Sequence, residues 1–309
     1  MLDRHLVETT AEELGTRPGL IEKDWHVVRA LGILAVLDHG DVQPVFSGGT
    51  SLSIAWGLIK RFSEDIDFKV AMAAAATTSG ARAQRRTYRK KVLEALGAAD
   101  FDLVGTPLAG NASNFFSADF AYRSEFDAAP GLRPHLRIEM TFEAPSLPSV
   151  ERPIRSLVAQ ALGQEPEVPA FPCVDPIETA ADKLSALAWR VCTRDRSAHD
   201  DDPTIIRHLH DLAALGSRVA VAPAFAPLLL EAATADTGRG GGQAPTNPGE
   251  RFSLMLKHLS TDPLWADEYD NFVLDVSFAR PNEVISFTAA LGTVRQLVKA
   301  SMEHREKGA

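Results

Sequence analysis

Residues 45–70 read VFSGGTSLSIAWGLIKRFSEDIDFKV and combine a glycine turn with two nearby carboxylates. The composition of both ends predicts strands, and the middle predicts a helix that Thr50 or Ser51 can cap. Successive side chains of a strand point to opposite faces, so Asp65 and Asp67 are expected on the same face. The stretch therefore predicts a strand, a turn, a helix and an acidic strand, in that order.

The two carboxylates indicate a metal site. Side by side on a strand, they repel each other unless a cation lies between them. Oxygen-only ligands suit Mg²⁺ or Mn²⁺, and Mg²⁺ usually takes phosphate oxygens as further ligands. The turn at Ser47, Gly48 and Gly49 allows the backbone to approach phosphate groups closely at a helix N-terminus. We therefore expect Asp65 and Asp67 to bind a divalent cation beside a phosphate-binding turn.

The composition is that of a globular protein. The 309 residues are 45% hydrophobic and 24% charged, and this length suits two domains. The formal charge of −9 argues against a generally basic nucleic-acid binder, although it allows a local basic patch. The two cysteines provide neither a disulfide framework nor a zinc pattern. Without a recognisable signal peptide or membrane-spanning run, we expect a cytoplasmic protein with no membrane partner.

Residues 21–40 predict an amphipathic helix with Lys23 and His26 on its surface. Residues 81–97 predict another helix, in which four arginines at helical spacing share a face. This face is either simply solvated or a contact for RNA phosphates. The arginines are Arg82, Arg85, Arg86 and Arg89.

Three further strands are predicted over residues 101–104, 114–126 and 135–142. The last strand alternates apolar and polar residues, which places Glu139 on its polar face. Asp119 has a similar position on the preceding strand. Both acids are either solvent-facing or part of the site at Asp65 and Asp67.

Prolines recur between residues 144 and 176, and the pattern after them is helical. We therefore predict one domain over residues 1–150 and a helical domain over residues 151–309. In the second domain Lys183 and Arg190 lie two helical turns apart, and Asp211 lies on the next helix. By themselves these three residues indicate an ordinary surface ion network.

The motifs together resemble the polymerase-β-like nucleotidyltransferase superfamily, and most closely the AbiEii/AbiGii toxin nucleotidyltransferases, a group similar to the MenT-type toxins. The resemblance is carried by GGTSL at residues 48–52, RFSEDIDF at 61–68, IETAADKLSALAWR at 177–190 and RHLHDL at 207–212. Family members carry E-I-x-A-E-K-L-x-A-L-x-x-R and then R-D-L-Y-D-L. Lys183 and Asp211 match the lysine and the last aspartate, whereas His208 and His210 replace an aspartate and a tyrosine.

The resemblance implies an α+β fold: a nucleotidyltransferase domain with a mixed sheet, then a mainly α-helical domain that completes the active site. It implies Mg²⁺-dependent transfer of a nucleoside monophosphate from an NTP to an acceptor. The acceptor would be the 3′ end of tRNA. The protein would be the toxin of a toxin–antitoxin or phage-defence system, with a cognate antitoxin as partner.

The resemblance also assigns roles to residues. Asp65, Asp67 and Glu139 would hold the metal, with Asp119 as the alternative to Glu139. Lys183 would neutralise triphosphate charge, and Asp211 would orient it or contact the base or acceptor. The expected NTP-binding residues are Ser47, Gly48, Gly49, Thr50, Ser51, Arg61, Ser63, Lys183 and Arg190.

Two alternatives stay open at this point. The same chemistry can act on another acceptor, either a small molecule such as an antibiotic or a protein hydroxyl. A degenerate relative can instead bind NTP or a partner without catalysis. The intact acids Asp65 and Asp67, together with Lys183, argue against the degenerate form.

Overall fold

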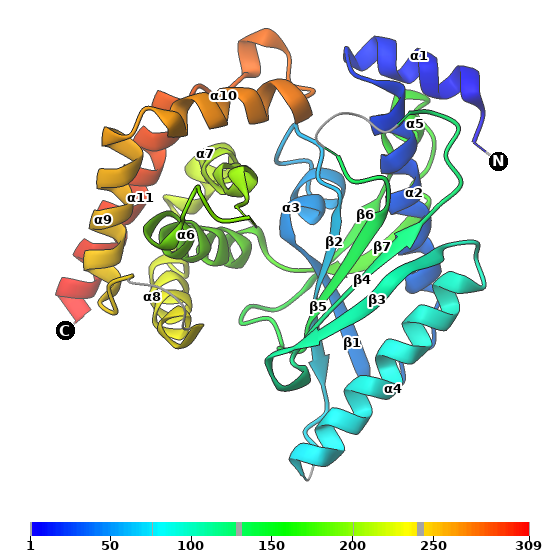
Figure 1. The fold of residues 1–309 in the computed structure, drawn as a ribbon, viewed down its shortest axis with the longest axis horizontal. Coiled ribbons are helices and arrows are strands. Elements are labelled where there is room, and N and C mark those ends of the chain that lie inside the picture. Colours follow the sequence, from blue (N-terminus) through cyan, green and yellow to red (C-terminus); the bar gives the residue numbers. More distant parts are fainter. Residues whose placement is uncertain (1, 76, 128–131, 200, 240–243, 309) are drawn as a thin grey trace. The chain divides into compact units, whose positions relative to one another are not determined.

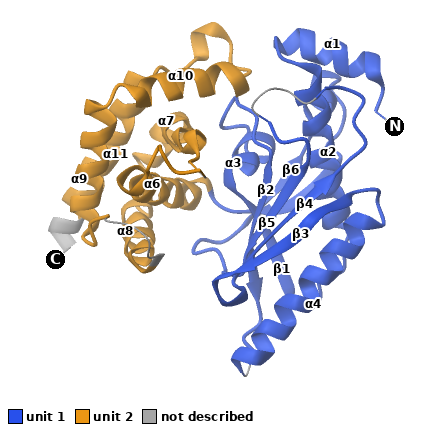
Figure 2. Ribbon diagram, viewed as in Figure 1, with its two compact units in different colours: residues 1–175 blue, residues 176–309 orange. Residues whose placement is uncertain are grey.

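The computed structural model describes residues 2–75, 77–127, 132–199, 201–239 and 244–308. The chain divides into two compact units, Met1–Asp175 (unit 1) and Pro176–Ala309 (unit 2), which Figure 2 shows in blue and orange. No helix in the described ranges is both long and apolar enough to cross a bilayer.

Unit 1 is built on a seven-stranded mixed sheet in the order β3-β4-β5-β2-β1-β7-β6 (Figure 1). β2 pairs with β5, and β1 with β7, in parallel; the other neighbouring strands are antiparallel. The strands are β1 (Val42–Ser47), β2 (Asp65–Met72), β3 (Asp102–Gly110), β4 (Phe115–Ala121), β5 (Leu136–Thr141), β6 (Val150–Ile154) and β7 (Val168–Cys173).

Two long helices cover the apolar face of this sheet. Pro18 occupies the first turn of α2, and the Thr77 hydroxyl caps α4 by accepting the Gly80 N–H. Leu31 of α2 and Val92 of α4 share one buried cluster with apolar residues of the central strands. The helical elements are α1 (Arg4–Leu14), α2 (Pro18–Ala35), α3 (Gly48–Thr50), η1 (Ser51–Ala55), α4 (Thr78–Gly97), η2 (Asn111–Ser113) and α5 (Leu157–Ala161).

The division between the units falls 25 residues later than the boundary predicted after residue 150. The proline-rich segment contributes β6 and β7 to the sheet, and Cys173 of β7 pairs with Phe46 of β1. Since β7 is hydrogen-bonded to the strand that precedes the glycine turn, this segment belongs to unit 1. Strand β6 forms the edge of the sheet, where a proline such as Pro153 is compatible with sheet structure.

Unit 2 is helical, as predicted. The stripe that includes Leu184 and Leu187 of α6 is buried, as are Leu209 and Leu212 of α7. α6 contacts α7, α8 and α9, and α11 contacts α7. The elements are α6 (Pro176–Thr193), η3 (Pro203–Ile206), α7 (Arg207–Val219), α8 (Phe225–Ala235), η4 (Asp236–Arg239), α9 (Pro248–Thr261), α10 (Leu264–Val276), η5 (Pro281–Glu283) and α11 (Phe287–Gly308).

Candidate active site

The glycine turn lies directly against the acidic strand. Ser47, the last residue of β1, pairs with Asp67 of β2. Gly48 follows with φ +74°, and a Cβ atom at this position would lie 1.9 Å from Oδ2 of Asp67. Two constraints therefore require glycine at position 48. Glycine adopts this backbone conformation readily, and the Asp67 carboxylate occupies the space that a side chain would need.

The next glycine is enclosed by the segment that leads into β2. A Cβ atom at Gly49 would lie 2.7 Å from Nη2 of Arg61 and 2.9 Å from Oγ of Ser63. Arg61 is buried, and its Nη1 donates to the carbonyl oxygen of Phe62 at 2.8 Å. Arg61 and Ser63, predicted from the sequence as phosphate contacts, thus pack against the turn that was predicted to bind phosphate.

The prediction that Thr50 or Ser51 caps the helix after the glycine turn is wrong. The helix begins at Gly48, so Thr50 and Ser51 lie inside it, and it continues as the π-helical turn η1. The Thr50 hydroxyl donates to the backbone carbonyl of Asp65 instead. This hydrogen bond connects the glycine turn to the first residue of β2.

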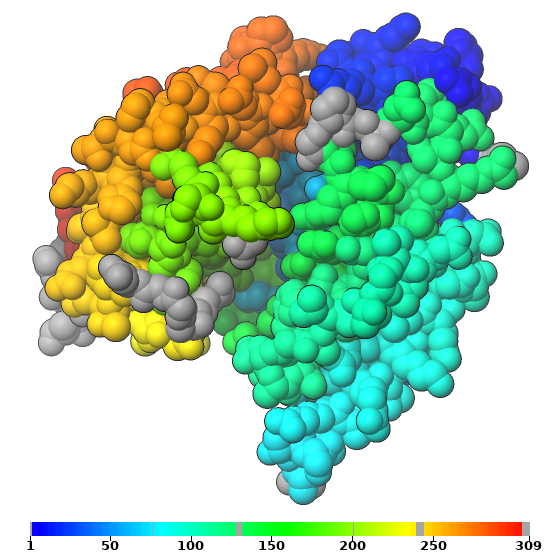
Figure 3. Space-filling view, in the orientation of Figure 1, coloured from blue at the N-terminus to red at the C-terminus, as the bar shows by residue number. Residues whose placement is uncertain are grey.

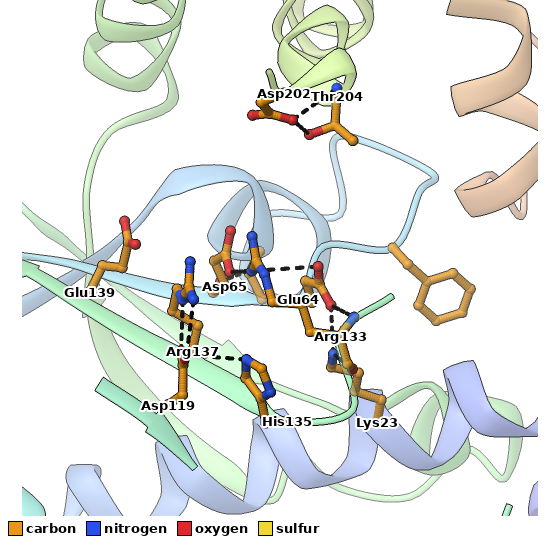
Figure 4. A network of polar contacts seen from close by, with 12 residues as sticks. Lys23, Glu64, Asp65, Asp119, Arg133, His135, Arg137, Glu139, Asp202 and Thr204 are labelled. Carbon is orange, nitrogen blue, oxygen red and sulfur yellow. Dashed lines mark hydrogen bonds and ion pairs between the residues drawn. The ribbon is translucent and has the colours of Figure 1, made fainter. Parts of the chain in front are cut away.

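The acids lie on one face of the sheet, as the alternation predicted. Asp65 and Asp67 are half-buried, whereas Ile66 between them is fully buried. Asp67 is the register partner of Glu139 on β5. Figure 4 shows Asp65 and Glu139 projecting from the same side of the sheet. The register thus places on one face of the sheet three carboxylates that are up to 74 residues apart in the sequence.

This donor set fits a hard divalent cation. Within the described ranges, no three His, Cys, Asp or Glu side chains converge into a complete metal site. Mg²⁺ is usually bound by one or two carboxylates, together with waters and substrate phosphates, rather than by an all-protein cage. Asp65 and Asp67 offer those two carboxylates beside the glycine turn.

Asp119, the alternative third acid, is held by other groups. Its two carboxylate oxygens accept from Nε and Nη2 of Arg137, at 2.7 and 2.9 Å. Nε2 of His135 lies 3.2 Å from Oδ2 of Asp119. The hydrogen bond from Arg137 lowers the pKa of the Asp119 carboxyl group, against the opposing effect of burial. Asp119 is therefore already neutralised by Arg137, whereas Glu139 is the register partner of Asp67.

The sequence did not reveal an ion-pair network that surrounds Asp65 (Figure 4). Lys23, predicted at the surface, is only 4% exposed; its Nζ lies 2.6 Å from Oε2 of Glu64. Burial lowers the pKa of Lys23, and the charge of Glu64 opposes this shift. The guanidinium of Arg133 contacts both Glu64 and Asp65. Glu64 and Asp65 are adjacent in the sequence, but the basic residues that pair with them, Lys23 and Arg133, are 41 and 68 residues away.

His26 is also buried rather than at the surface. Its ring lies 4.2 Å from that of Tyr122, and burial lowers its pKa to about 4. His26 is therefore neutral at physiological pH. Together with Trp25 and Tyr122 it lines a cavity of about 680 Å³ in unit 1, and none of the predicted site residues lines that cavity.

Unit 2 contains a buried ion pair. Nζ of Lys183 lies 2.8 Å from Oδ2 of Asp211, and the two side chains are 8% and 0% exposed. Nδ1 of His210 lies 3.5 Å from the other carboxylate oxygen. Burial and the nearby charge of Lys183 lower the pKa of His208 well below its ordinary value. Lys183 and Asp211 therefore do not belong to an exposed surface network, because their charges are kept from water and satisfied by each other.

Arg190, by contrast, is a surface group. Its Nη1 lies 3.5 Å from Oδ2 of Asp202, and both side chains are about 40% exposed. Such an exposed pair contributes little to stability.

The four arginines of α4 do not share one face. Arg85 and Arg89 pack over the rings of Phe142 and Phe116, at 5.9 and 5.6 Å. The other two, Arg82 and Arg86, are exposed. Helix α4 presents a broad surface at the bottom of Figure 3. The predicted basic face is thus divided between sheet packing and solvent.

The mixed sheet has a glycine turn after β1 and two acids on one face of β2, the next strand. This arrangement is typical of the nucleotidyltransferase class of enzymes. The profile of the nucleotidyl transferase AbiEii toxin family, type IV toxin–antitoxin system, matches residues 29–293. The chain belongs to this family. No curated protein sequence matches it significantly.

Among solved structures, the chain is similar to MenT4, a nucleotidyltransferase toxin from Mycobacterium tuberculosis H37Rv. The TM-score is 0.57 at 20% sequence identity, and the match covers 97% of this chain and 88% of MenT4. At this identity the likeness confirms the α+β fold. Family membership itself implies an enzyme with an NTP substrate and an antitoxin partner. Nucleotidyltransferases generally use divalent metal ions.

Proposed function

We propose that this toxin transfers a nucleoside monophosphate from an NTP to the 3′ end of tRNA, with Mg²⁺ or Mn²⁺ bound at Asp65 and Asp67. The observation that carries the proposal is the contact of Gly48 with Asp67 beside the Asp67–Glu139 register pair. It supports the proposal because the glycine turn follows a strand that pairs with β2, and the three acids lie on β2 and the adjoining strand β5. In the transfer the acceptor hydroxyl oxygen bonds to the α-phosphorus, and pyrophosphate leaves.

Residues of unit 1 have separate proposed roles in the transfer reaction. A bound divalent cation neutralises triphosphate charge and lowers the pKa of the attacking hydroxyl group. Asp65 and Asp67 hold the cation, and Glu139 favours removal of the hydroxyl proton. The backbone from Ser47 to Ser51 accommodates the phosphates, and Arg61 and Ser63 support this turn.

Lys183 is proposed to stabilise the charge that develops on the triphosphate, with Asp211 as its orienting partner. A buried ammonium ion acts more strongly on a phosphate than an exposed one, because water screens it less. The 2.8 Å contact with Asp211 restricts where this ammonium can point. Arg190 would add a weaker, solvent-screened positive charge.

The acceptor is proposed to dock partly on α4. Arg82 and Arg86 offer exposed guanidinium groups in a chain of net charge −9. Arginine contacts with phosphate give affinity that does not depend on base sequence and falls with salt. NTPs and tRNA are both cytoplasmic, so we place the reaction, and its control by a cognate antitoxin, in that compartment.

The test is to incubate the purified protein with each α-³²P-labelled NTP, total tRNA and MgCl₂, and to separate the products on a denaturing gel. We expect EDTA-sensitive label on tRNA, which Asp67→Asn abolishes and Asp119→Asn retains, since Asp119 is neutralised by Arg137. Label on the protein itself or on a small molecule would replace tRNA as the acceptor. NTP binding without any transfer would support a degenerate, non-catalytic protein.

A further inference from the structure

Arg133 holds the carboxylate that is proposed to bind the cation, and no sequence motif marks it. Its Nη1 makes an ion pair with Oδ1 of Asp65 and lies 3.5 Å from Oε1 of Glu64. The other oxygen of Asp65, Oδ2, makes no hydrogen bond or ion pair to any residue that the structure describes. One guanidinium nitrogen thus partly neutralises the acidic strand while the second oxygen stays available.

The backbone of Arg133 is fixed independently of its side chain. Its N–H donates to Oε2 of Glu64 at 2.9 Å, and its carbonyl oxygen accepts from Nζ of Lys23 at 2.7 Å. Lys23 and Glu64 are themselves paired, and the Lys23 side chain is 5% exposed. The buried pair therefore anchors the residue on both sides of its Cα atom, so the long side chain can rotate without movement of the chain.

The guanidinium also retains donors for another ligand. Nε and Nη2 of Arg133 have no protein partner among the described residues, and the side chain is 34% exposed. Guanidinium groups bind phosphate oxygens in a planar, two-pronged geometry that lysine does not offer. Arg137, on the same face, differs in this respect because its Nε and Nη2 already bind Asp119.

A divalent cation and a guanidinium that share one carboxylate repel each other. We propose that Arg133 is the counter-ion of Asp65 in the resting enzyme, and that its guanidinium moves to the triphosphate when the cation and NTP bind. The inference rests on the proposed metal and NTP site. It makes Arg133 an NTP-binding residue and explains how neighbouring acids are compensated before substrate arrives.

The experiment measures two affinities that should change in opposite directions. Binding of MnCl₂ alone is followed by the electron paramagnetic resonance of free Mn²⁺. Binding of α,β-imido analogues of the four NTPs, tested singly with saturating Mn²⁺, is followed by calorimetry. In Arg133→Gln we expect Mn²⁺ alone to bind about three-fold or more tighter, because a competing charge is gone. We expect the preferred analogue to bind about ten-fold or more weaker, because a charge-assisted phosphate contact is lost.

Arg137→Gln is the matched control, since it removes an arginine from the same sheet face. Its analogue affinity should change by less than about two-fold, because this guanidinium is committed to Asp119. Equal weakening in both variants would overturn the inference and indicate a general charge effect. Unchanged affinities in Arg133→Gln would overturn it as well and leave Arg133 a structural residue.

Asp65→Asn distinguishes failure of the inference from failure of the proposed function. If Asp65→Asn weakens Mn²⁺ binding while Arg133→Gln has no effect, only the role of Arg133 is refuted. If the wild-type protein binds neither Mn²⁺ nor any analogue, or binds them independently of Asp65, both proposals are refuted. Thermal unfolding and circular dichroism of each variant establish that the folded protein is being compared.

Discussion

Gly48→Ala perturbs the site through a single methyl group. The backbone at Gly48 has φ +74°, a conformation that costs alanine about 1–2 kcal/mol. The new Cβ would also lie 1.9 Å from Oδ2 of Asp67. Such contacts are not tolerated, so the carboxylate has to retreat by roughly 1 Å, a displacement that can reduce a reaction rate about 10²-fold. We therefore expect a modest loss of stability and a large loss of activity.

Gly57→Ala is the control for backbone strain. Gly57 has φ +62°, and a Cβ atom there would meet no heavy atom within 4 Å. Both variants should lose a similar 1–2 kcal/mol or so in urea unfolding. Only Gly48→Ala should lose about 10²-fold in initial rate in the labelled-NTP transfer assay, and its Mn²⁺ affinity should also fall.

Two results would refute this reasoning. Near-wild-type transfer by Gly48→Ala would mean that the position of the Asp67 carboxylate does not matter for the reaction. An equal loss of activity in Gly57→Ala would mean that backbone strain alone, rather than the contact with Asp67, explains the effect.

Three further outcomes are expected. Lys183→Met should lower kcat by about 10²–10³-fold, and it should destabilise the protein by about 3–5 kcal/mol because Asp211 is left buried without its partner. The additional change Asp211→Asn should restore stability but not kcat. Recovered activity in the double variant would mean that the pair has only a structural role. Reversal of both Arg82 and Arg86 to Glu should raise the KM for tRNA and flatten its salt dependence while NTP affinity stays constant; unchanged tRNA kinetics across a salt series would place RNA elsewhere. Burial raises the pKa of the Asp24 carboxyl group to about 7, so its stabilising contribution is complete below its ordinary pKa and is lost as pH rises through 7. Unfolding free energies should therefore fall by about 2–3 kcal/mol between pH 5 and 8 relative to Asp24→Asn, and parallel pH profiles for the two proteins would contradict this.

The sequence by itself determined the parts of the site that depend on local periodicity. Alternation along a strand is a property of consecutive residues, so the common face of Asp65 and Asp67 could be predicted. The same holds for the polar position of Glu139. The α+β class and the family also followed from short motifs, because the glycine turn and the acid pair lie within one stretch of sequence.

Only the tertiary structure decided which distant residues meet. The pairing of Asp67 with Glu139 depends on a strand register that no local pattern specifies. The side chains of Lys23 and Arg133 form ion pairs with Glu64 and Asp65, from which they are far apart in the sequence. No motif around either basic residue predicts the pairing.

Burial, too, is a collective property of the packed chain. Helical spacing grouped the arginines of α4, but the rings of Phe116 and Phe142 decided that Arg85 and Arg89 face the sheet. Spacing likewise allowed Lys183 and Asp211 to be surface groups, whereas the structure buries them as a pair. A charged side chain loses its hydration only when other elements pack around it. Whether they do depends on residues throughout the sequence, not only on those next to the charged residue.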